Sequence, residues 1–216
     1  HGAETWTRVE PTLDAYADAW ATAREDACHA MRTGAASDLL YERRVACLSR
    51  SRSALDALVE VFEQADTTVV EKAVAAAAGL PALARCEDAE GLLAQVEPPP
   101  EAIANEVAAL RDRLVRARSM EDAGRVGEAI AAANDVLAQA EPLAYPPLVA
   151  EALLRRGSGE LLAGEAESAD DDLGRATWVA LAAGDDIVAA EAAARRVFVR
   201  SELRGRPADA PIELPW

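Results

Sequence analysis

Few side chains in this 216-residue chain have the chemistry to act as catalysts. His29 is the one histidine apart from the first residue, and it directly follows Cys28 in a predicted helix. Adjacent residues of a helix point about 100° apart, so these two side chains do not form a Cys/His pair by themselves. We therefore expect His29 to be a surface or partly buried residue. No nucleophile, general base and orienting group can be assembled from the other residues, so we expect no catalytic residue and no cofactor site.

Two runs of acidic residues, Asp170-Asp171-Asp172 and Asp185-Asp186, have the ligand type of a calcium site. Both runs fall at the start or in the first turn of predicted helices, where carboxylates complement the helix dipole. We therefore predict that they stabilise helices and that the chain has no metal site.

The three cysteines, Cys28, Cys47 and Cys86, do not have the spacing of a metal site. All three fall on or near the apolar faces of predicted helices. This placement favours small, buried, reduced residues.

The elements that position these residues are indicated by a pattern that occurs twice, in residues 117–129 and 157–169. In each copy a small residue is followed seven positions later by glycine and twelve positions later by alanine. Gly124 and Gly164 are 40 residues apart, and Gly205 follows 41 residues after Gly164. Small residues allow two antiparallel helices to approach closely, here Ala117 against Ala129 and Gly157 against Ala169. Glycine allows the chain to reverse through a left-handed conformation. This order is typical of tetratricopeptide repeats (TPRs) in a long variant, with HEAT repeats as the alternative of similar period.

The fold class predicted is all-α, with antiparallel helical hairpins stacked as a right-handed TPR-like solenoid of about 40-residue repeats. The segment Pro98-Pro99-Pro100 cannot continue a helix and marks a boundary. We expect a helical segment at 1–97, with two long and two shorter helices, and TPR-like repeats with an extended C-terminal tail at 98–216. The predicted helices are 9–33, one capped by Ser37, one from Thr68 to Gly79, 88–96, 101–123, 126–140, 147–163, 166–183 and 187–203, and the tail contains Pro207, Pro211 and Pro215.

Composition restricts the partners. The chain contains 52 alanines, 4% aromatic residues and a net charge of −16. Strong acidity opposes binding to nucleic acid or to anionic lipid, and no apolar run approaches the roughly 18 residues that a membrane span needs. We expect a monomer with no nucleic-acid partner and no direct membrane contact.

The order of residues in the first 90 positions is more specific than the repeats. It reads Leu13-Asp14-x-Tyr16-Ala17-x-x-Trp20, Arg24-x-x-Ala27-Cys28, Arg43-x-x-x-Cys47-Leu48, and Leu80-Pro81 with Cys86 and Asp88. This order, followed by long TPRs, resembles the region C-terminal to the kinase domain in bacterial receptor-like (Hanks-type) serine/threonine protein kinases.

The resemblance implies a full-length serine/threonine protein kinase in which a kinase domain, and commonly one membrane-spanning helix, precede this region. The kinase motifs are absent from the 216 residues, because there is no Gly-x-Gly-x-x-Gly loop, no His-Arg-Asp and no Asp-Phe-Gly. ATP and Mg²⁺ are therefore expected only in the kinase domain. If the membrane span is present, the region lies on the extracytoplasmic face of the inner membrane, and otherwise it is cytoplasmic.

An extracytoplasmic location makes a disulfide an alternative to reduced cysteines. Hairpin register disfavours Cys28 with Cys47, because the two lie at different distances from the turn near residue 35. Cys47 with Cys86 is then as good a candidate as any other pair.

A TPR array binds a protein or peptide through the concave face lined by the first helix of each pair. We expect this role for a non-catalytic interaction or sensor region of the kinase. The alternative is a stand-alone scaffolding helical-repeat protein, with the arginines in local ion pairs. The residues predicted near the concave face are Arg111, Leu114, Arg118, Glu151, Leu154, Arg155, Arg195 and Arg196.

Overall fold

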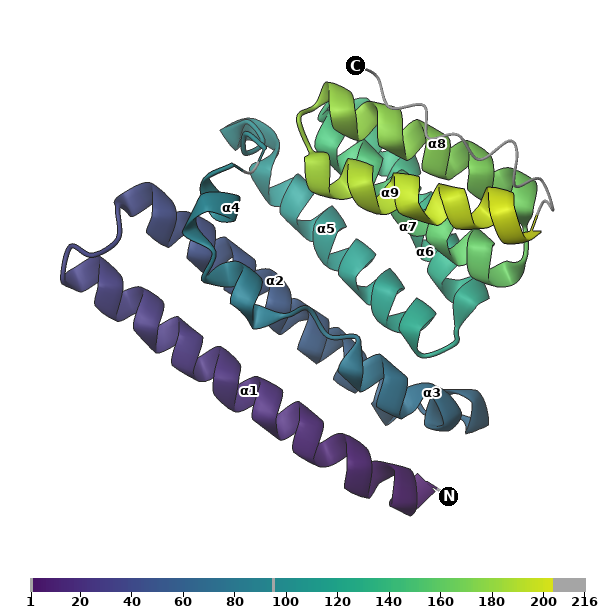
Figure 1. The fold of residues 1–216 in the computed structure, drawn as a ribbon, viewed down its shortest axis with the longest axis horizontal. Coiled ribbons are helices and arrows are strands. Elements are labelled where there is room, and N and C mark those ends of the chain that lie inside the picture. Colours follow the sequence, from purple (N-terminus) through teal and green to yellow (C-terminus); the bar gives the residue numbers. More distant parts are fainter. Residues whose placement is uncertain (1, 95, 204–216) are drawn as a thin grey trace. The chain divides into compact units, whose positions relative to one another are not determined.

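The computed structural model describes residues 2–94 and 96–203, and every regular element in these residues is a helix (Figure 1). The all-α class is therefore confirmed. Gly205 and the predicted extended tail lie outside the described residues. The α-helices are α1 (Gly2–Arg32), α2 (Asp38–Glu63), α3 (Thr67–Ala78), α4 (Ala89–Leu93), α5 (Glu101–Asp122), α6 (Val126–Ala140), α7 (Pro146–Ala163), α8 (Ala166–Ala182) and α9 (Asp186–Phe198). The short elements are the 3₁₀ helices η1 (Leu83–Cys86) and η2 (Glu141–Leu143) and the π-helix η3 (Val199–Leu203).

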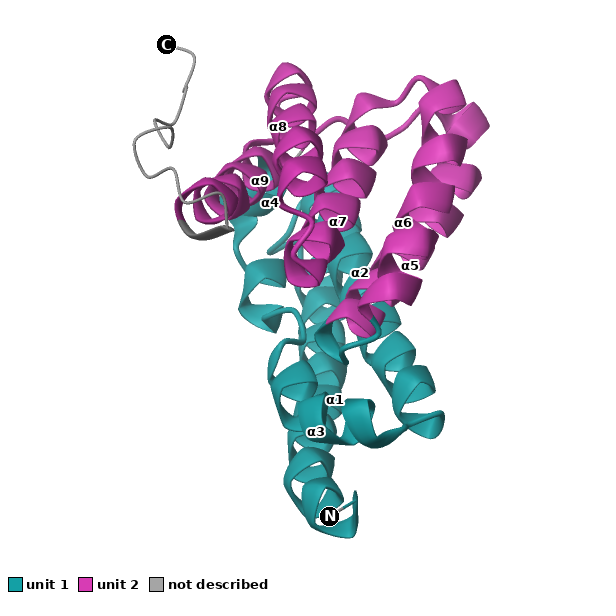
Figure 2. Ribbon diagram, turned by 90° about the vertical axis from the view of Figure 1, so that its right-hand side faces the viewer, with its two compact units in different colours: residues 1–95, 122–125 teal, residues 96–121, 126–216 magenta. Residues whose placement is uncertain are grey.

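The chain divides into two compact units, which are coloured separately in Figure 2. Unit 1 consists of residues 1–95 and 122–125, and unit 2 consists of residues 96–121 and 126–216. Each unit is described by itself below.

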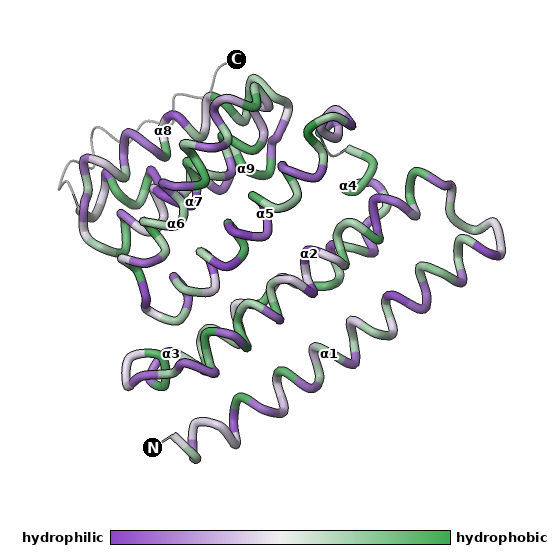
Figure 3. The backbone as a smooth tube through the Cα atoms, turned by 180° about the vertical axis from the view of Figure 1, so that it is seen from behind, coloured by the Kyte–Doolittle hydropathy of each residue, from purple (hydrophilic) through white to green (hydrophobic). Residues whose placement is uncertain are grey.

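Unit 1 is built on the hairpin of α1 and α2. Along α1 the tube in Figure 3 alternates between hydrophobic and hydrophilic colouring, as expected for a helix with one buried face. The chain reverses at Gly34, whose φ of +73° is the left-handed conformation that glycine favours. Ser37 then caps α2 as predicted, because its side chain accepts a hydrogen bond from the Leu40 N–H at 3.2 Å. The core of this unit is formed by Val9, Leu13, Leu58, Ala73, Ala76 and Ala77.

The later elements of unit 1 differ from the predicted ones. The cap of α3 is Asp66, which accepts from the Val69 N–H at 2.9 Å, and the helix begins before the predicted Thr68. Gly79 ends α3 with a right-handed φ of −80°, so its glycine freedom is not used there. Asp88 is the N-cap of α4. The helix ends at Leu93, so it is shorter than the predicted helix at 88–96. The turn η1 was not predicted, since a four-residue element has no hydrophobic period to read.

The repeated pattern lies in unit 2 except for its residues 122–125, which belong to unit 1. Both predicted turn glycines have the left-handed conformation, with φ of +85° at Gly124 and +78° at Gly164. Helix α6 has the predicted bounds, and α5, α7 and α8 differ from theirs by one residue at one end. Helix α7 contacts α6, α8 and α9. One continuous core runs through α5 to α9 and includes Val107, Leu110, Ala133, Val136, Leu148, Leu153, Leu173 and Ala192.

Close helix contact in unit 2 depends on two glycines of α7. A Cβ on Gly157 would lie 2.9 Å from Leu173 Cγ of α8, and a Cβ on Gly159 would lie 2.6 Å from Ile130 Cγ1 of α6. The sequence prediction placed Gly157 against Ala169, whereas the nearest atoms belong to Leu173 and Asp172, one turn further along α8. The difference follows from the side-chain direction, which a residue count from the turn does not include.

Candidate functional site

The predicted partner-binding residues lie on α5, α7 and α9 of unit 2. Arg111 of α5 donates from Nε to both carboxylate oxygens of Glu151 in α7 at 3.0 Å, and from Nη2 to Oε1 at 2.6 Å. Its guanidinium also lies over the Tyr145 ring, 5.6 Å from the centroid. Burial lowers the pKa of Arg111, but Glu151 and Tyr145 outweigh burial and raise it, so the group stays charged.

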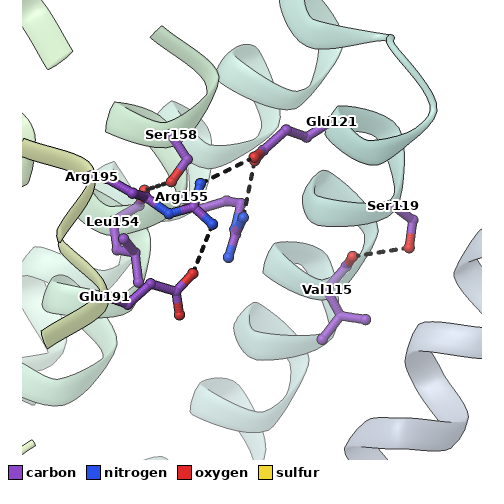
Figure 4. A network of polar contacts seen from close by, with 8 residues as sticks. All are labelled: Val115, Ser119, Glu121, Leu154, Arg155, Ser158, Glu191 and Arg195. Atoms are coloured by element: carbon purple, nitrogen blue, oxygen red, sulfur yellow. Dashed lines mark hydrogen bonds and ion pairs between the residues drawn. The ribbon is translucent and has the colours of Figure 1, made fainter. Parts of the chain in front are cut away.

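Glu121 joins three helices through its carboxylate (Figure 4). Its Oε2 accepts from Arg155 Nη1 of α7 at 2.9 Å, and its Oε1 lies 3.5 Å from Arg195 Nη1 of α9. Arg195 also donates from Nη2 to Glu191 Oε1 at 2.8 Å. Glu121 and Arg155 are only 6% and 8% exposed, so this is a buried charge network with its partners in place. Sequence analysis did not identify Glu121.

These ion pairs follow the repeat period. Arg111 and Glu151 are separated by 40 residues. Glu151 and Glu191 are also 40 residues apart, as are Arg155 and Arg195. The same Glu-x-x-x-Arg spacing therefore recurs on α7 and α9. This recurrence is visible in the sequence and was a signal that could have identified the network.

Arg196 belongs to a separate cluster at α8 and α9. Its Nε and the Nε of Arg200 each lie 2.8 Å from Oδ1 of Asp170. Burial raises the pKa of Asp170, but the hydrogen bonds from Arg200 and Arg196 outweigh burial and lower it. Asp170 is thus an arginine partner rather than a helix-start residue, which corrects the role predicted for it.

The remaining predicted contact residues have a different environment. Leu114 and Leu154 are 6% and 4% exposed and belong to the core of unit 2, so they present little surface to a partner. Arg118 is half-buried on α5 and has polar partners of its own. Of the eight residues, Arg155 is buried like the two leucines, whereas Arg111, Arg118, Glu151, Arg195 and Arg196 are partly exposed.

An open hollow of about 400 Å³ lies on α8 and α9, a region that the sequence prediction did not include. It is lined by Trp178, which is 44% exposed, together with Arg175, Arg196 and acidic residues of α8. The sequence signal for this hollow was Trp178, a tryptophan in a chain with only 4% aromatic residues.

A second buried cluster links α7 and α8. Arg156 donates from Nη2 to Asp172 Oδ1 at 2.7 Å and from Nη1 to Asn134 Oδ1 at 2.7 Å. Glu160, one turn along α7, is 8% exposed, and its Oε2 has no hydrogen-bond partner among the described residues. Burial and the nearby Asp172 carboxylate raise the pKa of Glu160 to about 7, against the opposing effect of Arg156.

The three cysteines lie in unit 1. Cys47 of α2 and Cys86 of η1 form a disulfide with Cα atoms 5.5 Å apart. Cys28 is a thiol whose Sγ lies 3.8 Å from the Tyr41 hydroxyl oxygen. The adjacent His29 is exposed.

Within the described part of the chain, no three His, Cys, Asp or Glu side chains are grouped closely enough to hold a metal ion. Among the same residues, none of the helices combines the length and the apolar character required to span a bilayer. The second acidic run has a local role, because Asp185 caps α9 by accepting from the Val188 N–H at 3.1 Å.

No protein-family model, curated protein or solved structure matches this chain.

Proposed function

We propose that this chain is a non-catalytic interaction or sensor region of a serine/threonine protein kinase, and that unit 2 binds a protein or peptide through a TPR-like face formed by α5, α7 and α9. In this proposal α5 with α6 and α7 with α8 are the two long repeats, and α9 follows as a first helix of the next. ATP and Mg²⁺ would act only in a kinase domain elsewhere in the protein.

The observation that carries the proposal is the set of ion pairs between first helices. Arg111 with Glu151, and Glu121 with Arg155 and Arg195, connect α5, α7 and α9 to one another. First helices of successive repeats are neighbours in a solenoid, and their common face is the one such proteins use for binding. The recurrence of the contacts at 40 residues supports stacked repeats.

A ligand at this face would replace one partner in some of these ion pairs. The Arg111 and Glu151 side chains are 23% and 24% exposed, so both retain surface for a second partner. An acidic peptide side chain approaching Arg111 would form a bidentate contact in place of part of the Glu151 contact. The partner class that fits is therefore a peptide with carboxylates spaced to meet Arg111 and Arg195.

The Cys47–Cys86 disulfide supports an extracytoplasmic location for the region, because structural disulfides persist in oxidising compartments. This location is the one expected if a membrane span precedes the region.

Selection from a random peptide library on the purified chain tests the binding face. We expect the selected peptides to be acidic, and Arg111→Gln to weaken binding by about tenfold or more, because it removes a charge-assisted contact. Arg113→Gln is the matched control, since Arg113 also lies on α5 but pairs with the exposed Asp135 of α6. Equal loss in both variants, or binding that maps to α6 and α8, would contradict the proposal.

A stand-alone scaffolding protein is the second candidate. It is favoured by one observation: Arg111, Arg155, Arg195 and Arg196 all have carboxylate partners inside unit 2. If the pairs serve only stability, no peptide will compete for them, and the same selection experiment will return no peptide that depends on Arg111.

A further inference from the structure

Two arginines of unit 1 lack the acidic partners that the arginines of unit 2 have. Arg24 lies on α1 and Arg44 lies on α2, and neither forms an ion pair with any described residue. The Arg24 Nη1 and Arg44 Nε atoms are buried and have no hydrogen-bond acceptor among the described residues. A buried donor without an acceptor costs free energy, so an acceptor is expected.

The two arginines lie at the same level of the α1–α2 hairpin. Two contacts between the helices fix this register on either side of them. The Trp20 Nε1–H donates to the Leu48 carbonyl oxygen at 2.7 Å, and Cys28 Sγ lies 3.8 Å from the Tyr41 hydroxyl oxygen.

Spacing then places both guanidinium groups between these contacts. Arg24 is four residues from both Trp20 and Cys28, so all three share one stripe of α1. On α2, Arg44 is three residues after Tyr41 and four before Leu48, so it shares the facing stripe.

Neither the contact of Arg44 Nη2 nor that of the Tyr41 hydroxyl is with a carboxylate. Arg44 Nη2 donates to the Glu87 carbonyl oxygen at 3.3 Å, which leaves its buried Nε unsatisfied. The hydroxyl of Tyr41 lies 3.8 Å from the weakly polar thiol of Cys28. Arg24 and Arg44 therefore place two cations at one level of the hairpin, each with a buried N–H group that has no acceptor among the described residues.

We propose that Arg24 and Arg44 bind a phosphate-sized oxyanion between α1 and α2, either free or as the phosphoryl group of a larger ligand. The planar guanidinium fork presents parallel N–H donors to such an anion, and one anion can accept from both groups. Both residues are partly exposed as a whole, so their buried Nη1 and Nε atoms lie close to the protein surface. Because the ion bridges two helices, its binding stabilises the hairpin.

Titration of the full 216-residue chain with sodium phosphate, against sodium chloride of matched ionic strength, tests the site. Calorimetry and thermal unfolding should both show saturable phosphate binding. Arg24→Gln and Arg44→Gln should each weaken it by about tenfold or more. Arg85→Gln is the control, because Arg85 is exposed in η1 and the substitution changes the charge by the same amount. Equal weakening by all three variants would overturn the site and leave only general charge attraction.

A measurement on the unaltered chain keeps the test decisive if a variant fails to fold. The phosphorus NMR line of phosphate should broaden saturably and sharpen again when sulfate competes. Absence of saturable broadening would overturn the proposal. Phosphoserine in place of phosphate separates the two sources, since comparable binding points to a phosphoryl group on a larger ligand and much weaker binding points to the free ion.

Discussion

Unit 1 and unit 2 are both built from antiparallel helices, but their polar side chains hold them together in different ways. In unit 1, side chains bind backbone carbonyls across the fold, as Tyr16 binds Pro81 at 2.9 Å, and a disulfide joins α2 to η1. In unit 2, carboxylates bind arginines between helices, as Glu121 binds Arg155 at 2.9 Å. In an irregular segment such as 80–88, backbone carbonyl groups need hydrogen-bond donors, and side chains of other elements supply them. Regular helical hairpins can instead repeat one side-chain pairing from one pair to the next.

The largest effect is expected from breaking the Cys47–Cys86 disulfide by replacing both cysteines with serine. The bond closes a sequence separation of 39 residues, so its loss should lower the free energy of unfolding of unit 1 by about 4 kcal/mol. Urea unfolding with amide hydrogen exchange measures this, and α2 and η1 should lose protection while α7 does not. Cys28→Ser is the control and should leave the response to reductant unchanged. Stability that does not depend on reductant would show that the bond does not hold unit 1.

A smaller effect is expected from Glu121→Gln in unit 2. The change leaves the buried Arg155 without a carboxylate, which should cost about 3 kcal/mol. Asp135→Asn breaks the ion pair with Arg113. The Asp135 side chain is 63% exposed, so this change should cost under about 1 kcal/mol. Chemical unfolding of both variants gives the comparison. Equal losses would mean that burial of the Glu121 network contributes nothing.

The stability of unit 2 should depend on pH through Glu160. Its pKa is raised from 4.5 to about 7 in the folded chain, so the folded state binds the proton more tightly than the unfolded state. The resulting stability is fully present below pH 4.5 and is lost as pH rises through about 7, with a change of order 2 kcal/mol. Glu160→Gln should remove this dependence. Urea midpoints measured from pH 5 to pH 9 that fall equally in both proteins would exclude Glu160 as the cause.

The smallest effects are expected at two glycines that differ in backbone conformation. Gly164 has φ of +78° and open space around it, so Gly164→Ala should cost about 1 kcal/mol from backbone strain alone. Gly127 lies within α6 with open space and an ordinary helical conformation, so Gly127→Ala should stabilise by up to about 1 kcal/mol. Thermal unfolding of both variants gives the signs. The same sign in both would contradict the role of the left-handed turn.

How far the sequence predicted the structure differs between the units. In α5 to α8 the turn glycines and the helix periodicity predicted every bound to within one residue, and those of α6 in full. The predicted last helix, 187–203, was too long, because α9 ends at Phe198. In unit 1, Asp66 and Thr68 both have side chains that can cap α3, and the choice of Asp66 depends on local geometry that residue types do not encode.

The candidate site was predicted less completely, because its partners are distant in sequence. The arginines of α5, α7 and α9 were identified from register, but Glu121 pairs with a residue 34 positions away, and periodicity within one helix carries no information about that pairing. Leu114 and Leu154 were placed on the binding face, whereas stacking of neighbouring helices buries them. Arg24 and Arg44 lie outside the predicted apolar stripes, so the hydrophobic pattern gave no indication that they bind a ligand.

The proposal that this region belongs to a serine/threonine kinase is tested most directly by the coding sequence upstream of His1 in the natural gene. The account predicts an in-frame kinase domain with a glycine-rich loop, His-Arg-Asp and Asp-Phe-Gly, and an apolar span of about 20 residues between it and this region. A kinase domain without the span would keep the signalling role and contradict the extracytoplasmic location. An upstream frame without any kinase domain would contradict the central claim and leave a helical-repeat scaffold.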